Sequence, residues 1–286
     1  MNDQEKTMAE ISRQHYISLW KLTTDGDKFY TNCSLLQPVI YKGNKAILKI
    51  PMEAEERQGS LMMAWFNGDG AAKVFAYTHN ALLLERLSGS HPTLTEMVNA
   101  GQDIEASRII CAVLKKLHAP RLQKPRFKLI TLDEWFADLW PAAVKYGGVI
   151  AQCAQLARIQ LNTRHEVTIL HGDVHHQNIL YDDTRGWLVI DPKRLIGDRA
   201  FDYANIFCNP DNETVLRPGR FEQQLEMIST LAGIDRTHLL KWVIAWCGLS
   251  ASWILNDPHP GETADSDLGL AQIALSLLKT FKDPIT

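Results

Sequence analysis

A polar loop between two short apolar runs constrains this chain more than any other segment; it lies between Ile169 and Asp191. The loop contains Asp173 and, five residues later, Asn178, and Asp191 ends the next apolar run eighteen residues after Asp173. In phosphoryl-transfer enzymes one aspartate accepts the proton of the attacking hydroxyl, while an asparagine and a second aspartate bind Mg²⁺ on the nucleotide phosphates. The spacing therefore predicts a phosphoryl-transfer site.

The residue types suit this chemistry. A carboxylate with a pKa of ~4 is ionised at neutral pH and can accept a hydroxyl proton, which predicts Asp173 as the catalytic base. Magnesium prefers oxygen ligands and keeps several non-protein ligands, which predicts Asn178 and Asp191 as its two protein ligands. Gly172 permits a sharp backbone path beside Asp173.

A zinc site is the rival interpretation of the loop, because His171, Asp173, His175 and His176 all lie within it. Adjacent histidines do not easily point at one ion, and no Glu-x-x-His or Cys-x-x-Cys pattern accompanies them. The magnesium interpretation is therefore favoured. We expect His171 to brace the loop, since its ring nitrogens can bind the backbone around Asp173.

Composition restricts the partners and the location. A net charge of -3 and a pI of 6.4 give no sign of a polyanion-binding surface, so no nucleic-acid partner is expected. The five cysteines are scattered and odd in number, which indicates reduced thiols in a reducing compartment. The polar N-terminus resembles no secretory signal, and we expect no apolar run that approaches the ~20 residues that span a bilayer. We expect a cytoplasmic protein without a membrane partner; the pattern predicts no oligomeric state.

Two regions differ in their periodicity. Up to Ser88 the pattern mixes strands with helices, whereas from Ser90 onward it is mostly helical and is interrupted by the strands of the polar loop. This predicts an α+β chain in which residues 1–88 form a nucleotide-binding lobe and residues 89–286 form a catalytic and substrate-binding lobe. In the first region, the apolar strand Ala46–Ile50 contains Lys49.

Lys49 alone would be interpreted as a lysine at a strand edge whose ammonium group reaches water. Beside the predicted phosphoryl-transfer residues, it is expected to bind the α- and β-phosphates, oriented by an acid of the next helix. Glu53, Glu55 and Glu56 are the candidates, and helical periodicity does not choose among them.

Five segments in this order resemble the aminoglycoside phosphotransferases, which have a protein-kinase-like fold, and most closely their streptomycin phosphotransferase branch, the aminoglycoside/hydroxyurea resistance kinases. The matching segments are AILK (46–49), WFNGDGA (65–71), LLLERL (82–87), HGDVHHQN (171–178) and GWLVIDP (186–192). A weaker match continues through IGD (196–198) to ANIF (204–207), so that the resemblance covers most of the chain.

The resemblance implies a two-lobed fold, with a small N-terminal β-sheet lobe and a larger, mainly helical C-terminal lobe, and with ATP and Mg²⁺ as cofactors. It assigns Asp173 as the base and Asn178 and Asp191 as metal ligands. It places Lys49 on the nucleotide phosphates and the helix acid on Glu56, and it brings the backbone of Glu85 to Leu87 to the adenine.

Two departures from protein kinases bear on regulation and on nucleotide contacts. Pro192 follows Asp191 where protein kinases have Phe-Gly, which argues for a constitutively assembled site. No G-x-G-x-x-G loop lies between Tyr30 and Tyr41, so a polar hairpin at residues 31–34 is the candidate cover for the nucleotide.

The resemblance implies a small cationic acceptor, an aminoglycoside of streptomycin type, whose hydroxyl receives the γ-phosphate. Such an acceptor needs carboxylates, and Asp198 and Asp202 are the candidates because they follow the magnesium ligand. Asp198 has an alternative role, in which it braces its loop through backbone N–H groups. The sequence leaves three other functions open: a kinase for an unrelated metabolite, a nucleotide-binding module without catalysis, and a protein kinase.

Overall fold

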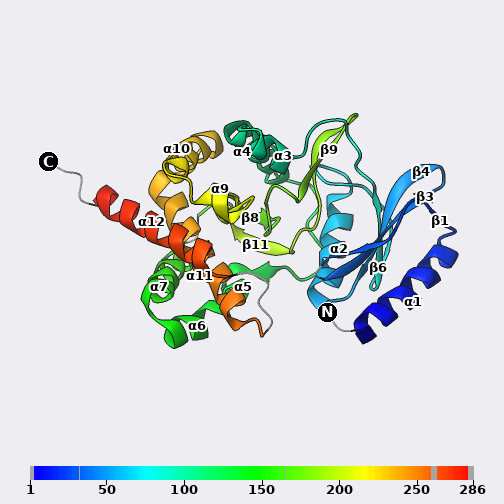
Figure 1. Ribbon diagram of the computed structural model, residues 1–286, viewed down its shortest axis with the longest axis horizontal. Helices are drawn as coiled ribbons and strands as arrows, with labels where there is room; N and C mark the ends of the chain where they lie inside the picture. Colours follow the sequence, from blue (N-terminus) through cyan, green and yellow to red (C-terminus); the bar gives the residue numbers. More distant parts are fainter. Residues whose placement is uncertain (1–2, 32, 164, 259–262, 283–286) are drawn as a thin grey trace. The chain divides into compact units, whose positions relative to one another are not determined.

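A computed structural model describes residues 3–31, 33–163, 165–258 and 263–282 (Figure 1). The chain divides into two compact units. Unit 1 consists of Met1–His91, Arg121–Lys128 and Asn178–Arg194, and unit 2 of Pro92–Pro120, Leu129–Gln177 and Leu195–Thr286. The antiparallel sheet near the N-terminus and the mainly helical later part confirm the predicted α+β class. The functional division into residues 1–88 and 89–286 stays a prediction.

An antiparallel sheet forms the centre of unit 1, with the strand order β1-β3-β4-β6-β5 and with β2 paired to β3. Its strands are β1 (Thr23–Thr24), β2 (Phe29–Tyr30), β3 (Ser34–Tyr41), β4 (Asn44–Pro51), β5 (Val74–Thr78) and β6 (Ala81–Glu85). Lys42 and Gly43 both have positive φ and join β3 to β4, with Tyr41 opposite Asn44. A two-residue hairpin of this kind favours the right-handed twist of its strands.

Strand alternation sends the side chains of β4 to opposite faces of the sheet. Leu48 and Ile50 join the hydrophobic core that includes Ala9 and Tyr16 of helix α1 (Asp3–Leu19). Lys49 therefore points to the other face, where helix α2 (Ala54–Phe66) packs. Figure 1 shows α1 and α2 on opposite sides of the sheet.

A second hairpin, β9 (Ile179–Asp182) and β10 (Gly186–Val189), also belongs to unit 1. At its open end, the Ile190 N–H donates to the Asn178 carbonyl at 2.9 Å. This bond brings the backbone that carries Asp191 beside Asn178. At the other end, Arg185 pairs with Glu85 and donates to two carbonyl groups of the turn after α2, which ties the hairpin to the main sheet.

Unit 2 is mainly helical. Its helices are α3 (Leu94–Asn99), α4 (Asp103–Leu117), α5 (Leu132–Trp135), α6 (Leu139–Tyr146), α7 (Gly148–Asn162), α8 (Phe201–Ala204), the 3₁₀ helix η1 (Asn205–Cys208), α9 (Asn212–Val215), α10 (Arg220–Ala232), α11 (Arg236–Asn256) and α12 (Asp265–Lys282). A small sheet with the order β7 (Ile130–Thr131), β11 (Leu195–Asp198), β8 (Val167–Leu170) carries the polar loop, because His171 directly follows β8.

Helix α11 is the core helix of unit 2 and packs against α7, α8 and α12. By length and composition it is apolar enough to cross a membrane, contrary to the expectation from the sequence that no segment approaches that length. Of the 18-residue stretch of α11 that was compared with a membrane span, 67% is buried inside the protein, as expected of a core helix. The helix packs tightly against α7 at Gly248, where an added Cβ would be 2.3 Å from Cys153 Cβ.

We predict that Gly248→Ala lowers the free energy of unfolding by about 1–3 kcal/mol, because the clash with α7 outweighs the gain of about 1 kcal/mol in helix propensity. Urea denaturation measures the change. Gly269→Ala in α12 is the matched control, since the nearest atom to its Cβ is a leucine methyl carbon at 3.4 Å. Equal stability changes in the two variants would contradict the close helix contact.

Candidate active site

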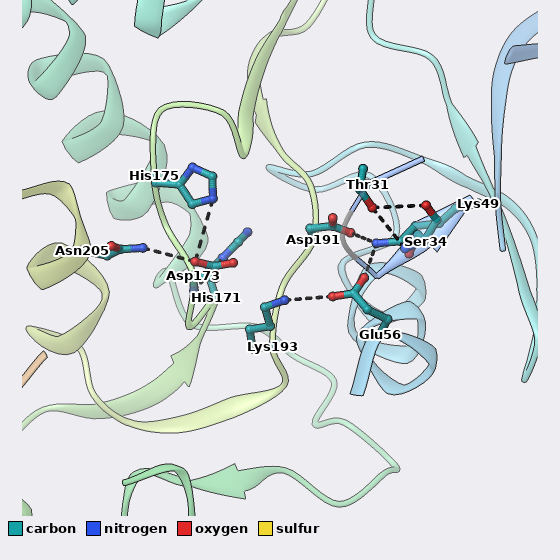
Figure 2. Close-up of polar contacts among 10 residues, drawn as sticks. All are labelled: Thr31, Ser34, Lys49, Glu56, His171, Asp173, His175, Asp191, Lys193 and Asn205. Carbon is teal, nitrogen blue, oxygen red and sulfur yellow. Dashed lines mark hydrogen bonds and ion pairs between the residues drawn. The ribbon is translucent and has the colours of Figure 1, made fainter. Parts of the chain in front are cut away.

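The predicted site residues occur in both units. In unit 1, Lys49 forms ion pairs with Glu56 and with Asp191 (Figure 2). Its Nζ lies 2.5 Å from Glu56 Oε2, and only 5% of Lys49 and 7% of Glu56 is exposed. A second lysine, Lys193, contacts the other carboxylate oxygen of Glu56 at 2.9 Å. Strand β4, helix α2 and the segment after β10 thus contribute to one charged cluster, here called the Lys49 cluster (Lys49, Glu56, Asp191 and Lys193).

Opposite charges in the Lys49 cluster keep Lys49 and Glu56 ionised despite their burial. Burial by itself raises the pKa of Glu56, but the ammonium groups of Lys49 and Lys193 lower it to about 2. Burial likewise lowers the pKa of Lys49, but the carboxylates of Asp191 and Glu56 outweigh it and raise that pKa overall. Glu56 and Lys49 are therefore both ionised at neutral pH, in a place where either one alone would be costly to charge.

Asp191 and Asn178 both offer side-chain oxygen atoms, the donors that a hard cation such as Mg²⁺ prefers. Asp191 has a left-handed backbone, with φ 61°, which aspartate tolerates better than most residues. Its carboxylate is paired at one oxygen with Lys49, yet 36% of the side chain is exposed. Both residues lie at the open end of the β9–β10 hairpin, and a carboxylate with an amide oxygen is a donor set that suits Mg²⁺ and leaves the remaining positions to phosphate and water.

The nucleotide-contacting residues implied by the resemblance lie at the end of β6, which is flanked by β4 and β5 in the main sheet. The Glu85 N–H donates to Lys73 O, and its carboxylate accepts from Lys73 N and pairs with Arg185. Leu87 lies just beyond β6. The side chain of Glu85 thus has a bracing role within unit 1, and the predicted adenine contacts of this backbone segment stay predictions.

The hairpin predicted to cover the nucleotide lies between β2 and β3. Ser34 N donates to Thr31 Oγ1 at 3.1 Å, and the Cys33 carbonyl accepts from Met52 N. Burial, reinforced by the charge of Glu56, raises the pKa of the Cys33 thiol to about 11. The turn is therefore near the Lys49 cluster; Asn32, also a candidate, lies outside the described residues.

In unit 2, Asp173 is held by contacts on both its backbone and its carboxylate. The Asp173 N–H donates to Nδ1 of the fully buried His171 at 3.2 Å, which confirms the predicted bracing role of His171. Asn205 Nδ2 donates to Asp173 Oδ1 at 3.2 Å, and His175 Nε2 lies 3.9 Å from the same oxygen. With 26% of its side chain exposed, Asp173 is oriented and still accessible, as a catalytic base must be.

Asp202 holds the turn that precedes Asp173. Its carboxylate accepts from the N–H groups of His171 and Gly172, at 2.9 and 2.7 Å, and contacts His118 Nε2 at 2.7 Å. Its side chain is completely buried. Gly172 has a φ of 84°, which allows the sharp turn that these two bonds require.

Asp198 is committed to bracing in the same way as Asp202. It contacts His238 Nε2 at 2.7 Å and accepts from Ala200 N at 2.9 Å. These contacts support the bracing alternative for Asp198. The acceptor-binding role of Asp198 and Asp202 stays an untested prediction.

Two residues that contact Asp202 and Asp173 were not predicted from the sequence. His118 is a lone histidine at the end of α4, and Asn205 begins η1; neither has a local pattern that indicates its partner. Among the described residues, no group of three His, Cys, Asp or Glu side chains is arranged to hold a metal ion, and this includes the four loop residues of the zinc interpretation. Burial lowers the pKa of His176 to about 4.

Comparisons with known proteins extend these observations. The family model of the aminoglycoside/hydroxyurea antibiotic resistance kinases matches residues 19–258. This chain belongs to that family. The kinase is 42% identical over 265 residues to streptomycin 3''-kinase of Klebsiella pneumoniae, covering 91% of this chain and 98% of the relative. It is 26% identical over 259 residues to streptomycin 6-kinase of Streptomyces griseus, covering 84% and 81%.

A solved structure supports the fold. A thermostable mutant of aminoglycoside phosphotransferase APH(4)-Ia, in ternary complex with ADP and hygromycin B, matches with a TM-score of 0.66 at 17% identity, covering 92% of this chain and 97% of the other. The predicted protein-kinase-like fold is thereby confirmed, and the kinase is an enzyme that transfers phosphate to an alcohol group.

We predict that Glu56→Gln destabilises the kinase in a pH-dependent way. The pKa of Glu56 is lowered to about 2 in the folded protein, so its stabilisation is fully present above about pH 4.5 and is lost as the pH falls toward 2. The difference in unfolding free energy from wild type should reach about 3 kcal/mol at pH 7 and shrink below pH 4.5. Thermal unfolding between pH 3 and 7 measures it.

The exposed Glu105 in α4 provides a control for that series. Glu105→Gln should unfold like wild type across the range, because surface charges contribute little. A constant, pH-independent loss in Glu56→Gln would refute the assignment of the effect to ionisation of Glu56.

We predict that Asp202→Asn lowers turnover more than it weakens nucleotide binding. The new amide NH₂ group would face a backbone donor of the Asp173 turn, so the turn should lose its fixed path, with a stability loss of about 1–3 kcal/mol. Steady-state kinetics and nucleotide calorimetry separate the two effects. Wild-type kcat in Asp202→Asn would contradict the positioning role.

Proposed function

We propose that this kinase transfers the γ-phosphate of ATP to a hydroxyl group of an aminoglycoside of streptomycin type and thereby inactivates the antibiotic. One observation supports the proposal most strongly: the buried Lys49 is paired with both Glu56 and Asp191. A cation held this way is preorganised for phosphate oxygens, and an accessible carboxylate beside it is preorganised for a metal ion.

The proposed roles combine the family resemblance with the contacts of the residues. Lys49, oriented by Glu56, binds the α- and β-phosphates of ATP. Asn178 and Asp191 hold Mg²⁺, which when bound neutralises phosphate charge. Asp173, oriented by Asn205 and by the His171 brace, accepts the proton of the attacking hydroxyl. The backbone of Glu85 to Leu87 is proposed to bind the adenine.

The choice of acceptor is supported by the relatives. The relative at 42% identity is a streptomycin kinase, and so is the Streptomyces griseus relative. Aminoglycosides carry ammonium or guanidinium groups, and the net charge of -3 of this kinase agrees with a cationic substrate. We propose the 3''-hydroxyl of streptomycin as the first site to test, because it is the position in the name of the more similar relative.

A coupled ADP-release screen tests the proposed function. It compares streptomycin with other aminoglycosides, hydroxyurea and common amino alcohols, and mass spectrometry locates the added phosphate. Turnover with streptomycin is the expected result. Turnover with an amino alcohol alone would favour the metabolite kinase instead, and nucleotide binding without any turnover would favour a binding module.

We predict that Asp173→Ala and Asp191→Ala separate catalysis from metal binding. Asp173→Ala should leave the Kd for Mg²⁺–ATP nearly unchanged while lowering kcat by at least about 10²-fold, because it removes only the proton acceptor. Asp191→Ala should weaken Mg²⁺–ATP binding itself, because it removes the carboxylate ligand. Calorimetry and steady-state kinetics measure both. Equal loss of nucleotide binding in the two variants would contradict these roles.

A further inference from the structure

Lys193 is the charged residue of the Lys49 cluster that the proposed reaction does not use. Its Nζ lies 2.9 Å from Glu56 Oε1, whereas Lys49 uses Oε2, so the two lysines divide one buried carboxylate between them (Figure 2). The Lys193 side chain is 20% exposed and that of Glu56 only 6%. A contact of this kind is partly shielded from water and therefore stronger than a surface ion pair.

The backbone around Lys193 is fitted closely to α2. The carbonyl oxygen of Pro192 would lie 2.7 Å from a Cβ at Gly59, so only glycine allows this approach. Gly59 follows Glu56 by three positions and lies on the same helix face. Arg194, which follows Lys193, has a positive φ of 57° and donates to the Lys128 carbonyl, so the segment has a second anchor.

The charges explain why a second lysine matters. Lys49 faces two carboxylates, Glu56 and Asp191, so these three groups together carry one negative charge at neutral pH. Lys193 brings the sum to zero. When Asp191 binds a metal ion, Lys49 remains beside Glu56, and without Lys193 the full charge of that carboxylate would act on Lys49 alone.

We propose that Lys193 is a positioning residue that acts through Glu56. It holds α2 against the segment after Asp191, and by sharing the charge of Glu56 it leaves the Lys49 ammonium available to the nucleotide phosphates. In this kinase a second lysine, two residues after the proposed metal ligand, keeps the Lys49–Glu56 pair assembled. The proposal rests on the proposed function, since it concerns the same nucleotide site.

A double-mutant cycle tests the proposal. Lys193→Met, Glu56→Gln and the double variant are compared by calorimetry with Mg²⁺–ATP and by steady-state kinetics. Lys193→Met should weaken nucleotide binding about tenfold and leave the acceptor KM unchanged, a size within the range of coupling between contacting residues. In the Glu56→Gln background, Lys193→Met should have no further effect. Lys193→Arg should restore most of the binding, because it keeps the positive charge.

Two controls separate this role from general effects. Lys45→Met removes an exposed lysine of β4 and should bind nucleotide like wild type. If Lys193→Met does not fold, as judged by circular dichroism, Lys193→Gln repeats the cycle with a polar side chain that lacks the charge.

The outcomes are distinct. An equal loss of binding in both backgrounds would overturn the proposal, because Lys193 would then act independently of Glu56; so would unchanged binding in Lys193→Met. A wild-type protein that binds no nucleotide would instead refute the proposed function on which the cycle depends.

Discussion

A buried ammonium group must have carboxylate partners to stay charged, and this requirement organises unit 1. Lys49 is placed on the face of β4 that looks toward α2, because Leu48 and Ile50 on either side of it are needed in the core under α1. Once there, its ammonium group is satisfied by Glu56 and Asp191. The strand, the helix and the segment after the β9–β10 hairpin are thus held in one arrangement by charge as well as by packing.

In unit 2, buried backbone N–H groups need acceptors, and the carboxylate of Asp202 supplies them. The turn before Asp173 leaves two backbone N–H groups in a buried environment, and Asp202 accepts from both while it contacts His118. An unpaired N–H there would cost as much as a lost hydrogen bond. The position of the proposed base therefore depends on residues that never need to touch a substrate.

Much of the candidate site could be predicted from the sequence, because its residues are separated by short, characteristic numbers of residues along the chain. Asp173 and Asn178 belong to one loop between β8 and β9, and Asp191 follows β10, so the chemistry could be inferred from strand-like runs around polar residues. His171 was also correctly predicted as a brace, since its partner is only two residues away. Local contacts of this kind leave a pattern in the sequence.

Other assignments needed the fold. Asp198 and Asp202 are predicted from the sequence as acceptor-binding residues, and only the fold shows that their oxygens contact His238, His118 and backbone donors. His118 is 84 residues from Asp202, and Lys49 is 142 residues from Asp191. A local sequence pattern cannot predict contacts between residues so far apart. The contact of Lys193 with Glu56 is equally remote, at 137 residues.

The sequence by itself determined the family, the fold class and the residue types at the proposed reaction centre, because these depend on motif order and on spacing along the chain. Only the tertiary structure decided how the charges are paired: that Glu56 is shared by two lysines, and that Asp202 faces inward to hold a turn. The physical reason is that burial and ion pairing depend on distances in space, which the chain sets only when it folds.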